Sequence, residues 1–354
     1  MTHSVYFAST ILHLYAAAVI AAERTGEQAH LVFIDQPEGR DFPLYSLVQD
    51  WPQSPFASVR LFYGRFQGLV NKLQKRKQLF AKLEGLITTL RPANLFVGND
   101  RRIEFQYSMH IADTLGCEPI GHYMDEGTFT YIGRKASSGF GDKVLDNLAK
   151  KLSYGFWWKN PPTVGGSDWI QYVHAAFPEQ IHPLLKNKRI VPLSASGFSA
   201  PPLLALSSRL MEQHGFDPQQ LRPLDVLFTL PHESLFEKDP EYKQRIMAVI
   251  QQMIRDGKQV AAKYHPRNSG PDVLYLQSEG VTLLPAGISF EAMLPHLPNQ
   301  CEIWGDVSST LLIAKWLRPE IKAFSLIDGK SDQRLITLFK SLDVTIFSFS
   351  SHKQ

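Results

Sequence analysis

The sequence predicts an α/β protein built from two Rossmann-like domains, and three observations support this fold class. Apolar segments of strand length alternate with longer helical segments, an order typical of parallel sheets covered on both faces. This alternation occurs twice, and residues 160–222 between the two runs are irregular and rich in Pro, Gly and Ser. The length of 354 residues also suits two domains. We therefore expect an N-terminal domain over residues 1–222 and a C-terminal domain over residues 223–354.

The first run opens with a β-α-β unit. Apolar residues 5–8 predict a buried strand, the Ala-rich residues 12–24 predict a helix, and residues 31–34 predict a second strand. A secretory signal peptide over residues 5–22 is the alternative, but no positively charged segment precedes this stretch. Polar residues also interrupt it, which argues against a membrane-spanning helix.

The alternation continues along the rest of the first run. After the Arg91-Pro92 pair, residues 94–97 predict a buried strand. A helix over residues 104–115 and a strand over residues 119–123 follow. The loops after these strands are therefore expected at one edge of a parallel sheet, where open α/β sheets bind their ligands.

The second run repeats the pattern from residue 224 onward. Asp239 is expected to cap a helix that has Pro240 at its first position, since Asp accepts hydrogen bonds from free helical N–H groups. Strands are expected at residues 226–230, 259–264, 281–284, 302–304 and 321–327, and helices at residues 240–256, 289–294 and 308–316.

The composition is that of a globular protein and argues against several other classes. Hydrophobic residues make up 44% and charged residues 20%, which is too apolar for a disordered chain. Lys and Arg total 37 against 34 Asp and Glu, too even a balance for a dedicated nucleic-acid binder. The two cysteines, Cys117 and Cys301, exclude a disulfide scaffold and a multi-cysteine zinc site, and we expect both as buried thiols.

An acidic motif, Asp125-Glu126-Gly127, follows the strand predicted at residues 119–123. A general base needs a carboxylate held near a substrate hydroxyl on a rigid support, and a strand end provides one. Taken alone, the motif could equally be a solvated turn.

A histidine motif, Lys263-Tyr264-His265-Pro266-Arg267, ends the strand predicted at residues 259–264. An imidazole between two cations suits contact with a phosphate, to which it could donate a hydrogen bond or a proton. An ordinary strand end is the alternative. The other His-Pro pair, His182-Pro183, follows no buried strand and is interpreted as structural.

A hydroxyl motif, Ser308-Ser309-Thr310, opens the helix predicted at residues 308–316. Hydroxyls and free N–H groups at a helix N-terminus favour an anion. A plain Ser or Thr helix cap is the alternative.

With these three motifs in this order, the sequence resembles the bacterial sialyltransferases of GT-B fold. The similarity is to the capsule polysialyltransferase and lipooligosaccharide sialyltransferase families, which share an acidic D/E-D/E-G motif, an HP motif and a Ser/Thr motif. The segment Gly98-Asn99-Asp100-Arg101 after an N-terminal strand also fits, whereas residues 135–222 match nothing in the families. The resemblance implies a GT-B fold, with two Rossmann-like domains and a central cleft.

The resemblance also implies an activity. The enzyme would move a sialic acid, or the related pseudaminic or legionaminic acid, from a CMP-sugar to a capsule or lipooligosaccharide glycan with inversion. Asp125 would be the general base that deprotonates the acceptor hydroxyl, and His265 would contact the leaving CMP phosphate as acid or hydrogen-bond donor. No metal or other cofactor is expected, and the chain lacks the DxD motif that holds a metal in many transferases of diphosphate sugars.

Binding residues are carried over from the same resemblance. The expected donor-binding residues are Ser308, Ser309 and Thr310 with Lys263 and Pro266 near the phosphate, Glu291 on the ribose, and the backbone of Gly287 and Ile288 on the cytosine. The expected acceptor-side residues are Glu126, Gly127, Asn99 and Arg101. Asp306 departs from the expected pattern, because an acid beside a phosphate site must point away or be neutralised.

Two other functions stay open from the residues. A GT-B transferase that uses a UDP- or GDP-sugar would also lack the DxD motif. A non-catalytic protein that binds glycan or nucleotide could have the same fold.

Residues 65–91 carry seven Lys or Arg against the single acid Glu84, with apolar residues at helical spacing. A basic amphipathic helix of this kind could lie on the inner face of the cytoplasmic membrane, pack on the sheet with a basic solvent face, or guide an acidic glycan. The aromatic segment 154–159 beside Lys150 and Lys151 suits a membrane interface, a sugar platform or core packing. We expect a cytoplasmic protein with peripheral membrane contact and no nucleic-acid partner.

Overall fold

The computed structural model describes the chain except for residues 67, 134–150, 152–154, 156, 328–331 and 348–354. It contains two compact units, Met1–Phe198 and Ser199–Gln354. The boundary therefore lies earlier than the expected position after residue 222. The physical reason is that helix α7 (Pro201–Gln213) packs against α10 (Phe290–Met293) and so belongs to the second unit.

The first unit is a seven-stranded parallel sheet in the order β3-β2-β1-β4-β5-β6-β7. Its strands are β1 (Thr2–Ala8), β2 (Glu27–Pro37), β3 (Phe56–Arg65), β4 (Asn94–Val97), β5 (Ile120–Met124), β6 (Ile170–Ala175) and β7 (Arg189–Pro192). Its α-helices are α1 (Ile11–Glu23), α2 (Pro43–Gln49), α3 (Leu69–Leu90), α4 (Ile103–Thr114) and α5 (Thr128–Ile132), with short 3-10 turns at Pro178–Gln180, Pro183–Leu185 and Ser196–Ser199.

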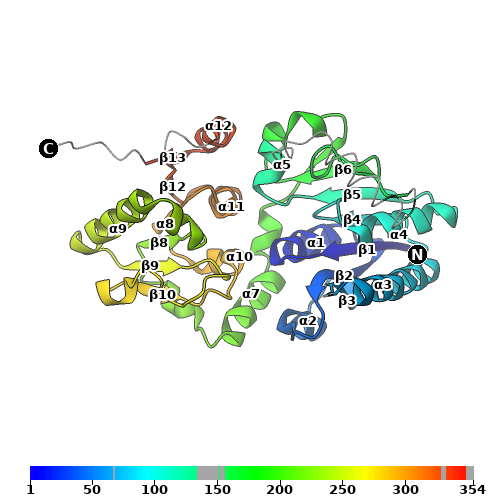
Figure 1. The fold of residues 1–354 in the computed structure, drawn as a ribbon, viewed down its shortest axis with the longest axis horizontal. Coiled ribbons are helices and arrows are strands. Elements are labelled where there is room, and N and C mark those ends of the chain that lie inside the picture. The colour runs from blue at the N-terminus through cyan, green and yellow to red at the C-terminus, as the bar shows by residue number, and fades with distance from the viewer. Residues whose placement is uncertain (67, 134–150, 152–154, 156, 328–331, 348–354) are drawn as a thin grey trace. The chain divides into compact units, whose positions relative to one another are not determined.

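The predicted β-α-β unit is confirmed by β1, α1 and β2. The side chain of Thr10 caps α1 by accepting a hydrogen bond from the His13 N–H at 3.2 Å. Right-handed crossovers place α3 and α4 on the same face of this sheet, where they pack side by side (Figure 1). Strand β1, fully buried from Val5 to Ala8, lies inside the sheet between β2 and β4.

Three strands of the first unit were not predicted. Strand β3 is half exposed along most of its length, so its residues lack a clean apolar pattern. Strands β6 and β7 lie within residues 160–222, the stretch expected to be irregular. β7 is an edge strand of four residues without a single buried side chain, and β6 is flanked by turns, which explains why composition concealed both.

The second unit is a six-stranded parallel sheet in the order β10-β9-β8-β11-β12-β13. Its strands are β8 (Val226–Thr229), β9 (Val260–Lys263), β10 (Thr282–Leu284), β11 (Glu302–Gly305), β12 (Ala323–Ser325) and β13 (Val344–Ile346). Besides α7 and α10, its α-helices are α8 (Ser234–Lys238), α9 (Pro240–Arg255), α11 (Ser309–Leu317) and α12 (Gln333–Ser341), and 3-10 turns lie at Pro218–Leu221, Leu276–Glu279 and Leu294–His296.

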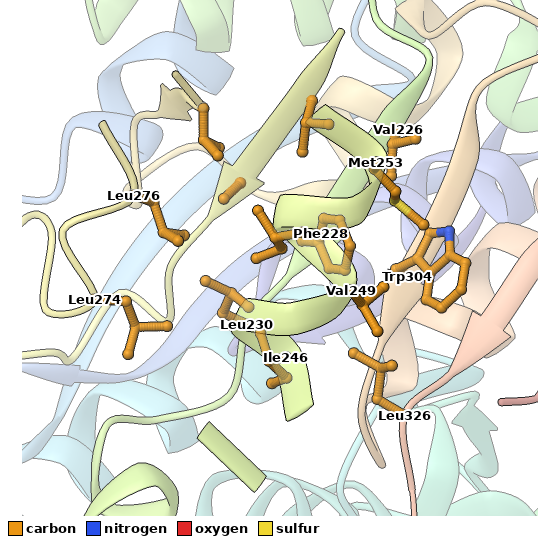
Figure 2. Close-up of a cluster of buried hydrophobic side chains, with 14 of the residues drawn as sticks. Val226, Phe228, Leu230, Ile246, Val249, Met253, Leu274, Leu276, Trp304 and Leu326 are labelled. Atoms are coloured by element: carbon orange, nitrogen blue, oxygen red, sulfur yellow. The ribbon is translucent and has the colours of Figure 1, made fainter. Parts of the chain in front are cut away.

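The expected strands of the second run are all confirmed, and Asp239 caps α9 by accepting from the Tyr242 N–H at 2.9 Å. Phe228 of β8, Ile246 of α9 and Trp304 of β11 meet in one buried cluster, shown in Figure 2. Burying each such side chain contributes about 1.5–3 kcal/mol. This cluster holds the carboxyl ends of β8, β9 and β11 at fixed positions.

The basic helix expected over residues 65–91 is α3. The second half of its apolar stripe packs in the interior, where Leu79, Leu83, Leu86 and Ile87 are buried, whereas Leu73 in the first half is exposed. This agrees with the reading of a helix packed on the sheet with a basic solvent face. In the described part of the chain, no helix combines the length and the hydropathy that a bilayer crossing requires.

The aromatic segment 154–159 is described only in part, since Tyr154, Phe156 and Lys150 lie outside the described residues. Trp158 is buried, and the Trp157 ring lies 5.4 Å from the Tyr107 ring, centroid to centroid. These two tryptophans therefore belong to the packing of the first unit. Of the cysteines, Cys301 is buried as expected and Cys117 is partly buried, and both are free thiols.

Candidate functional site

Both sheets have the strand order of a Rossmann fold, in which the chain turns back past the first strand. The point of reversal lies between β1 and β4 in the first unit and between β8 and β11 in the second. Loops leave these neighbouring strands in opposite directions, which opens a crevice at their carboxyl ends where ligands bind. The hydroxyl motif follows β11 at such a point, and the acidic and histidine motifs follow β5 and β9, one strand away from it.

The second unit has a cavity of about 300 Å³ at this position. The residues lining it follow β8, β9 and β11 or lie on α10 and α11: Thr229, Leu230, Pro231, His232, Lys263, Tyr264, His265, Pro266, Phe290, Asp306, Val307, Ser308 and Thr310. The fold therefore brings together two of the predicted motifs, which lie more than forty positions apart in the sequence. Ser309 of the hydroxyl motif is not among the lining residues.

His265 is partly buried and held in a defined orientation. Its Nδ1 accepts the backbone N–H of Arg267 at 3.2 Å, which assigns the proton of the neutral ring to Nε2. Burial, followed by the electrostatic influence of Arg267, His232 and Lys263, lowers the pKa of His265 below its ordinary value. At neutral pH this residue is therefore a neutral hydrogen-bond donor, not a cation.

The hydroxyl motif forms the start of α11. Ser308 is the N-cap, and its Oγ accepts the Thr310 N–H at 3.2 Å. The Thr310 hydroxyl lies 3.0 Å from the hydroxyl of Thr229, which in turn donates to the Trp304 carbonyl at 3.3 Å. Thr310 thus donates its proton inside the protein, whereas the Ser308 hydroxyl proton is available to a ligand.

Asp306 lines the same cavity and is 6% exposed. Burial, followed by the negative charge of Asp306, raises the pKa of the Tyr242 hydroxyl on α9. The carboxylate therefore lies near a phenol of its own unit, which suits the requirement that this acid be kept from a bound anion.

Lys263 is partly buried, and its Nζ donates to the Ala286 carbonyl at 3.0 Å. Burial lowers the pKa of Lys263, and the charge of Glu291 opposes this shift, so these two side chains are neighbours. Glu291, Gly287 and Ile288 do not line the cavity. Ile288 is 2% exposed, and the expected contact of its backbone with a base stays a prediction.

In the first unit, Asp125 follows β5 and is 3% exposed. Its carboxylate accepts hydrogen bonds from the N–H groups of Gly127 at 2.7 Å and Ala176 at 2.9 Å. It also accepts from the hydroxyls of Thr130, at 2.8 Å, and Tyr131. Burial raises the pKa of Asp125 and these hydrogen bonds oppose the rise. This geometry anchors the loop after β5. The role of proton acceptor expected for Asp125 stays a prediction.

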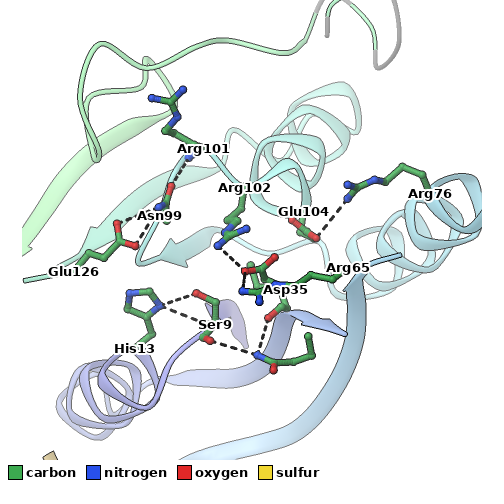
Figure 3. Close-up of polar contacts among 12 residues, drawn as sticks. Ser9, His13, Asp35, Arg65, Arg76, Asn99, Arg101, Arg102, Glu104 and Glu126 are labelled. Carbon is green, nitrogen blue, oxygen red and sulfur yellow. Dashed lines mark hydrogen bonds and ion pairs between the residues drawn. The ribbon is translucent and has the colours of Figure 1, made fainter. Parts of the chain in front are cut away.

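Glu126 is placed differently. Its two carboxylate oxygens each lie 3.1 Å from the side-chain nitrogen of Asn99, which follows β4. Burial raises the pKa of Glu126 to about 7, with further increments from Asp100 and Asp125 and opposition from Asn99 and Arg102. A carboxylate whose pKa lies near neutrality suits a general base at physiological pH. Figure 3 shows this Asn99–Glu126 pair.

The segment after β4 is held by buried contacts. Asp100 is 0% exposed and accepts the N–H groups of Gly165 at 2.9 Å and Ser167 at 2.7 Å. The Arg101 guanidinium donates to the Asn160 side chain at 3.0 Å, and its backbone N–H donates to Asn99 at 3.1 Å. The predicted acceptor-side residues Asn99, Arg101 and Glu126 are therefore joined through Asn99.

An arginine–carboxylate cluster lies beside this segment and was not predicted from the sequence. Asp35, the last buried residue of β2, pairs with Arg65 at 2.7 Å and with Arg102 at 2.6 Å (Figure 3). Asp35 has φ of 61°, a left-handed conformation that is unusual for a residue with a side chain. The pair Arg101-Arg102 directly after Gly98-Asn99-Asp100 is the sequence signal that could have revealed it.

Within the described ranges, no three His, Cys, Asp or Glu side chains are grouped so that they could hold a metal ion. Gly98 allows the close approach of α1 to the end of β4, because an added Cβ would lie 2.0 Å from the His13 ring.

Comparison with known proteins gives a consistent result. A family model described as alpha-2,8-polysialyltransferase matches residues 4–327. The alpha/beta-galactoside alpha-2,3-sialyltransferase of the luminous marine bacterium Photobacterium phosphoreum is similar in structure, with a TM-score of 0.58, 16% identity and 98% of each chain covered. The UDP-GlcNAc 2-epimerase of Methanocaldococcus jannaschii gives a TM-score of 0.60 at 12% identity, covering 98% of this chain and 89% of the other. No curated protein sequence matches the chain.

The two structural similarities support the fold, two Rossmann-like α/β domains of GT-B type, and confirm the predicted fold class. The family match spans both sheets, from β1 to the end of β12, and includes the acidic, histidine and hydroxyl motifs. The chain belongs to the alpha-2,8-polysialyltransferase family.

Proposed function

We propose that the protein transfers a sialic acid, or a related nonulosonic acid, from a CMP-activated donor to a hydroxyl of a cell-surface glycan, with inversion. The observation that carries the proposal is the cavity of the second unit, which joins His265 to Ser308 of α11 at a Rossmann switch point. Its donors are a neutral imidazole, a hydroxyl and a helix N-terminus. Such groups suit the single phosphate of a CMP-sugar, whose leaving group carries less charge than a diphosphate.

The chemistry assigned to the second unit is stabilisation of the leaving group. As the bond between the anomeric carbon and the phosphate oxygen breaks, the electron pair stays on that oxygen and CMP gains one negative charge. His265, through Nε2–H, and Ser308, through its hydroxyl, donate to the phosphate oxygens at that moment. Donors fixed before the reaction need no reorganisation as charge develops. Lys263 adds positive charge, and no resident metal is required for this step.

The chemistry assigned to the first unit is deprotonation of the acceptor hydroxyl. We assign this role to Glu126 and not to Asp125, because Asp125 is buried and already accepts four hydrogen bonds. Glu126 contacts Asn99 alone through its carboxylate in the described structure, and its pKa is about 7. Gly127 and Arg101 belong to the same acceptor side. The proton of the acceptor moves to Glu126 as the acceptor oxygen attacks the anomeric carbon.

Peripheral contact with an anionic membrane is a further part of the proposal, and it rests on α3. Lys72, Lys77 and Lys82 are exposed on this helix, and the Leu73 side chain is 56% exposed among them. Sedimentation with vesicles of anionic lipid tests it. Binding that disappears in Lys72→Ala/Lys77→Ala/Lys82→Ala supports membrane contact, and binding equal to that of neutral vesicles contradicts it.

The donor class is tested by thermal shift of the purified protein with CMP, UDP, GDP and ADP, with and without EDTA. A ligand at about 100 times its Kd stabilises the native state by about 2.7 kcal/mol, or about 5–10 °C for a domain of this size. We expect stabilisation by CMP alone, unaffected by EDTA. Selective stabilisation by UDP or GDP would instead favour a transferase of those sugars, and CMP binding without turnover on any glycan would favour a binding protein.

A further inference from the structure

The donor cavity contains a second histidine to which the three motifs assign no role. His232 follows β8, at the strand that flanks the switch point, and it lines the same cavity as His265. The two rings lie 5.3 Å apart, centroid to centroid, at an angle of 71°. His232 is partly buried and contributes to the wall of the cavity.

Both imidazoles are held by the same local geometry. The Nδ1 of His232 accepts the N–H of Ser234 at 3.2 Å, as the Nδ1 of His265 accepts the N–H of Arg267 at 3.2 Å. The Ser234 hydroxyl lies a further 3.0 Å from the same Nδ1. In each case the acceptor role of Nδ1 places the proton of the neutral ring on Nε2.

The loops that carry the two histidines are also tied to each other. Ser269, in the loop after β9, donates to the Glu233 carboxylate through its N–H at 2.9 Å and its hydroxyl at 2.8 Å. The Asn268 side chain accepts the Glu233 N–H at 3.2 Å. These hydrogen bonds join the loop after β8 to the loop after β9 and so fix the spacing of the two rings.

We propose that His232 is a second catalytic imidazole, whose Nε2–H donates, together with that of His265, to the phosphate of the leaving nucleoside monophosphate. This inference rests on the proposed function. When the bond to the sugar breaks, the phosphate changes from a monoanion to a dianion, and the two Nε2–H donors share the added charge. The loss of one such preorganised donor typically lowers kcat by about 10²–10³-fold.

A structural role for His232 would be limited to its hydrogen bond with Ser234 at the start of α8. An Asn side chain can make this bond, since Asn commonly accepts the N–H two residues further along. His232→Asn therefore keeps the turn and removes the Nε2–H. His182 provides a matched control, because its Nδ1 accepts the Leu184 N–H at 3.3 Å in the same way, but it lies in the first unit and outside this cavity.

The experiment compares the affinities of CMP and cytidine by calorimetry for the wild type, His232→Asn and His182→Asn, together with kcat for CMP release. A hydrogen bond to a charged group corresponds to about 10–100-fold in affinity. We expect His232→Asn to lose that factor for CMP, to bind cytidine as the wild type does, and to lower kcat by about 10²-fold. His182→Asn should retain the wild-type ratio of CMP to cytidine affinity.

The inference would be overturned if His232→Asn had the wild-type ratio of CMP affinity to cytidine affinity and the wild-type kcat. The same pairs of measurements with uridine and UMP, and with guanosine and GMP, separate this outcome from failure of the proposed donor class. If UMP or GMP binds and CMP does not, the proposed donor is wrong, and loss of the phosphate contribution in His232→Asn still supports the imidazole pair. A wild-type protein that binds no monophosphate more tightly than its nucleoside overturns the pair itself.

Discussion

Exchange of Glu126 for Gln separates the two carboxylates of the acidic motif. Gln retains an oxygen that can accept the Asn99 N–H groups, which lie 3.1 Å from both Glu126 oxygens. It cannot accept a proton from an acceptor hydroxyl. Turnover should therefore fall while the contacts of the loop after β5 persist.

The magnitude follows from the two roles of the carboxylate. Loss of a positioned general base costs about 10²–10⁴-fold in turnover, or about 3–5.5 kcal/mol of activation free energy. The free energy of unfolding, by contrast, should be higher in Glu126→Gln than in the wild type at pH 8. The pKa of Glu126 is raised from 4.5 to about 7 in the folded state, so its contribution to stability is fully present below pH 4.5 and is lost as the pH rises through 7. At pH 8 the wild type has lost this contribution to its free energy of unfolding, which is at most about 3 kcal/mol, whereas Gln does not titrate and the variant loses nothing.

The assay combines a pH profile of kcat/KM with denaturant unfolding at pH 5 and pH 8. The wild-type profile should rise with pH as Glu126 loses its proton near pH 7, and the residual activity of Glu126→Gln should lack this rise. Asp125→Asn is the matched comparison. Its amide nitrogen would leave a buried donor such as the Ala176 N–H unpaired, which costs about 1–3 kcal/mol of stability at both pH values. Wild-type turnover in Glu126→Gln, or a pH profile unchanged by it, would refute the reasoning.

Four other outcomes are expected. Lowering the pH from 6.5 towards 4 should reduce the free energy of unfolding. Burial lowers the pKa of His174 to about 4 and that of His122 further, so these histidines bind protons in the unfolded chain before they do so in the folded protein. Denaturant midpoints measured across this pH range check it. Gly98→Ala should lower the Tm, since the added Cβ would meet the His13 ring at 2.0 Å, and differential scanning calorimetry checks it. Thr310→Val should weaken the binding of CMP less than Ser308→Ala does, as measured by calorimetric titration, because the Thr310 hydroxyl already donates its proton to Thr229. Gly127→Ala should cost about 1–3 kcal/mol in denaturant unfolding, because Gly127 has φ of 87°.

The sequence predicted those elements whose burial is uniform. β1, β4, β8 and β9 are buried along almost their whole length, so their apolar runs mark them plainly. β3 and β7 lie at the edges of their sheet with half-exposed side chains, and this mixed environment removes the periodic signal. The expected domain boundary was wrong for a different reason. The unit to which α7 belongs depends on the elements that it packs against, and the sequence pattern does not show these.

The sequence predicted the candidate-site residues that belong to a motif at a strand end. It did not predict a residue that joins the cavity only through the folding of the sheet. His265 and Ser308 share a cavity because β9 and the loop before α11 end at the same edge of one sheet. His232 carries no motif, since a single histidine after a strand is common in any sequence. Its relation to His265 arises only when β8 and β9 pair in parallel, which brings two loops together that are more than thirty residues apart.

The acidic motif illustrates why two adjacent carboxylates acquire different roles. Directly after β5 the chain leaves the strand, and Asp125 is buried whereas Glu126 is only partly buried. Gly127, with its positive φ, turns the chain so that its own N–H reaches Asp125, and the Thr130 and Tyr131 hydroxyls of α5 complete the shell. Asp125 thereby fixes the direction in which Glu126 leaves the strand. Gly127 and Asp125 therefore shape the loop, and the pKa near 7 belongs to Glu126, the residue to which we assign the proton-acceptor role.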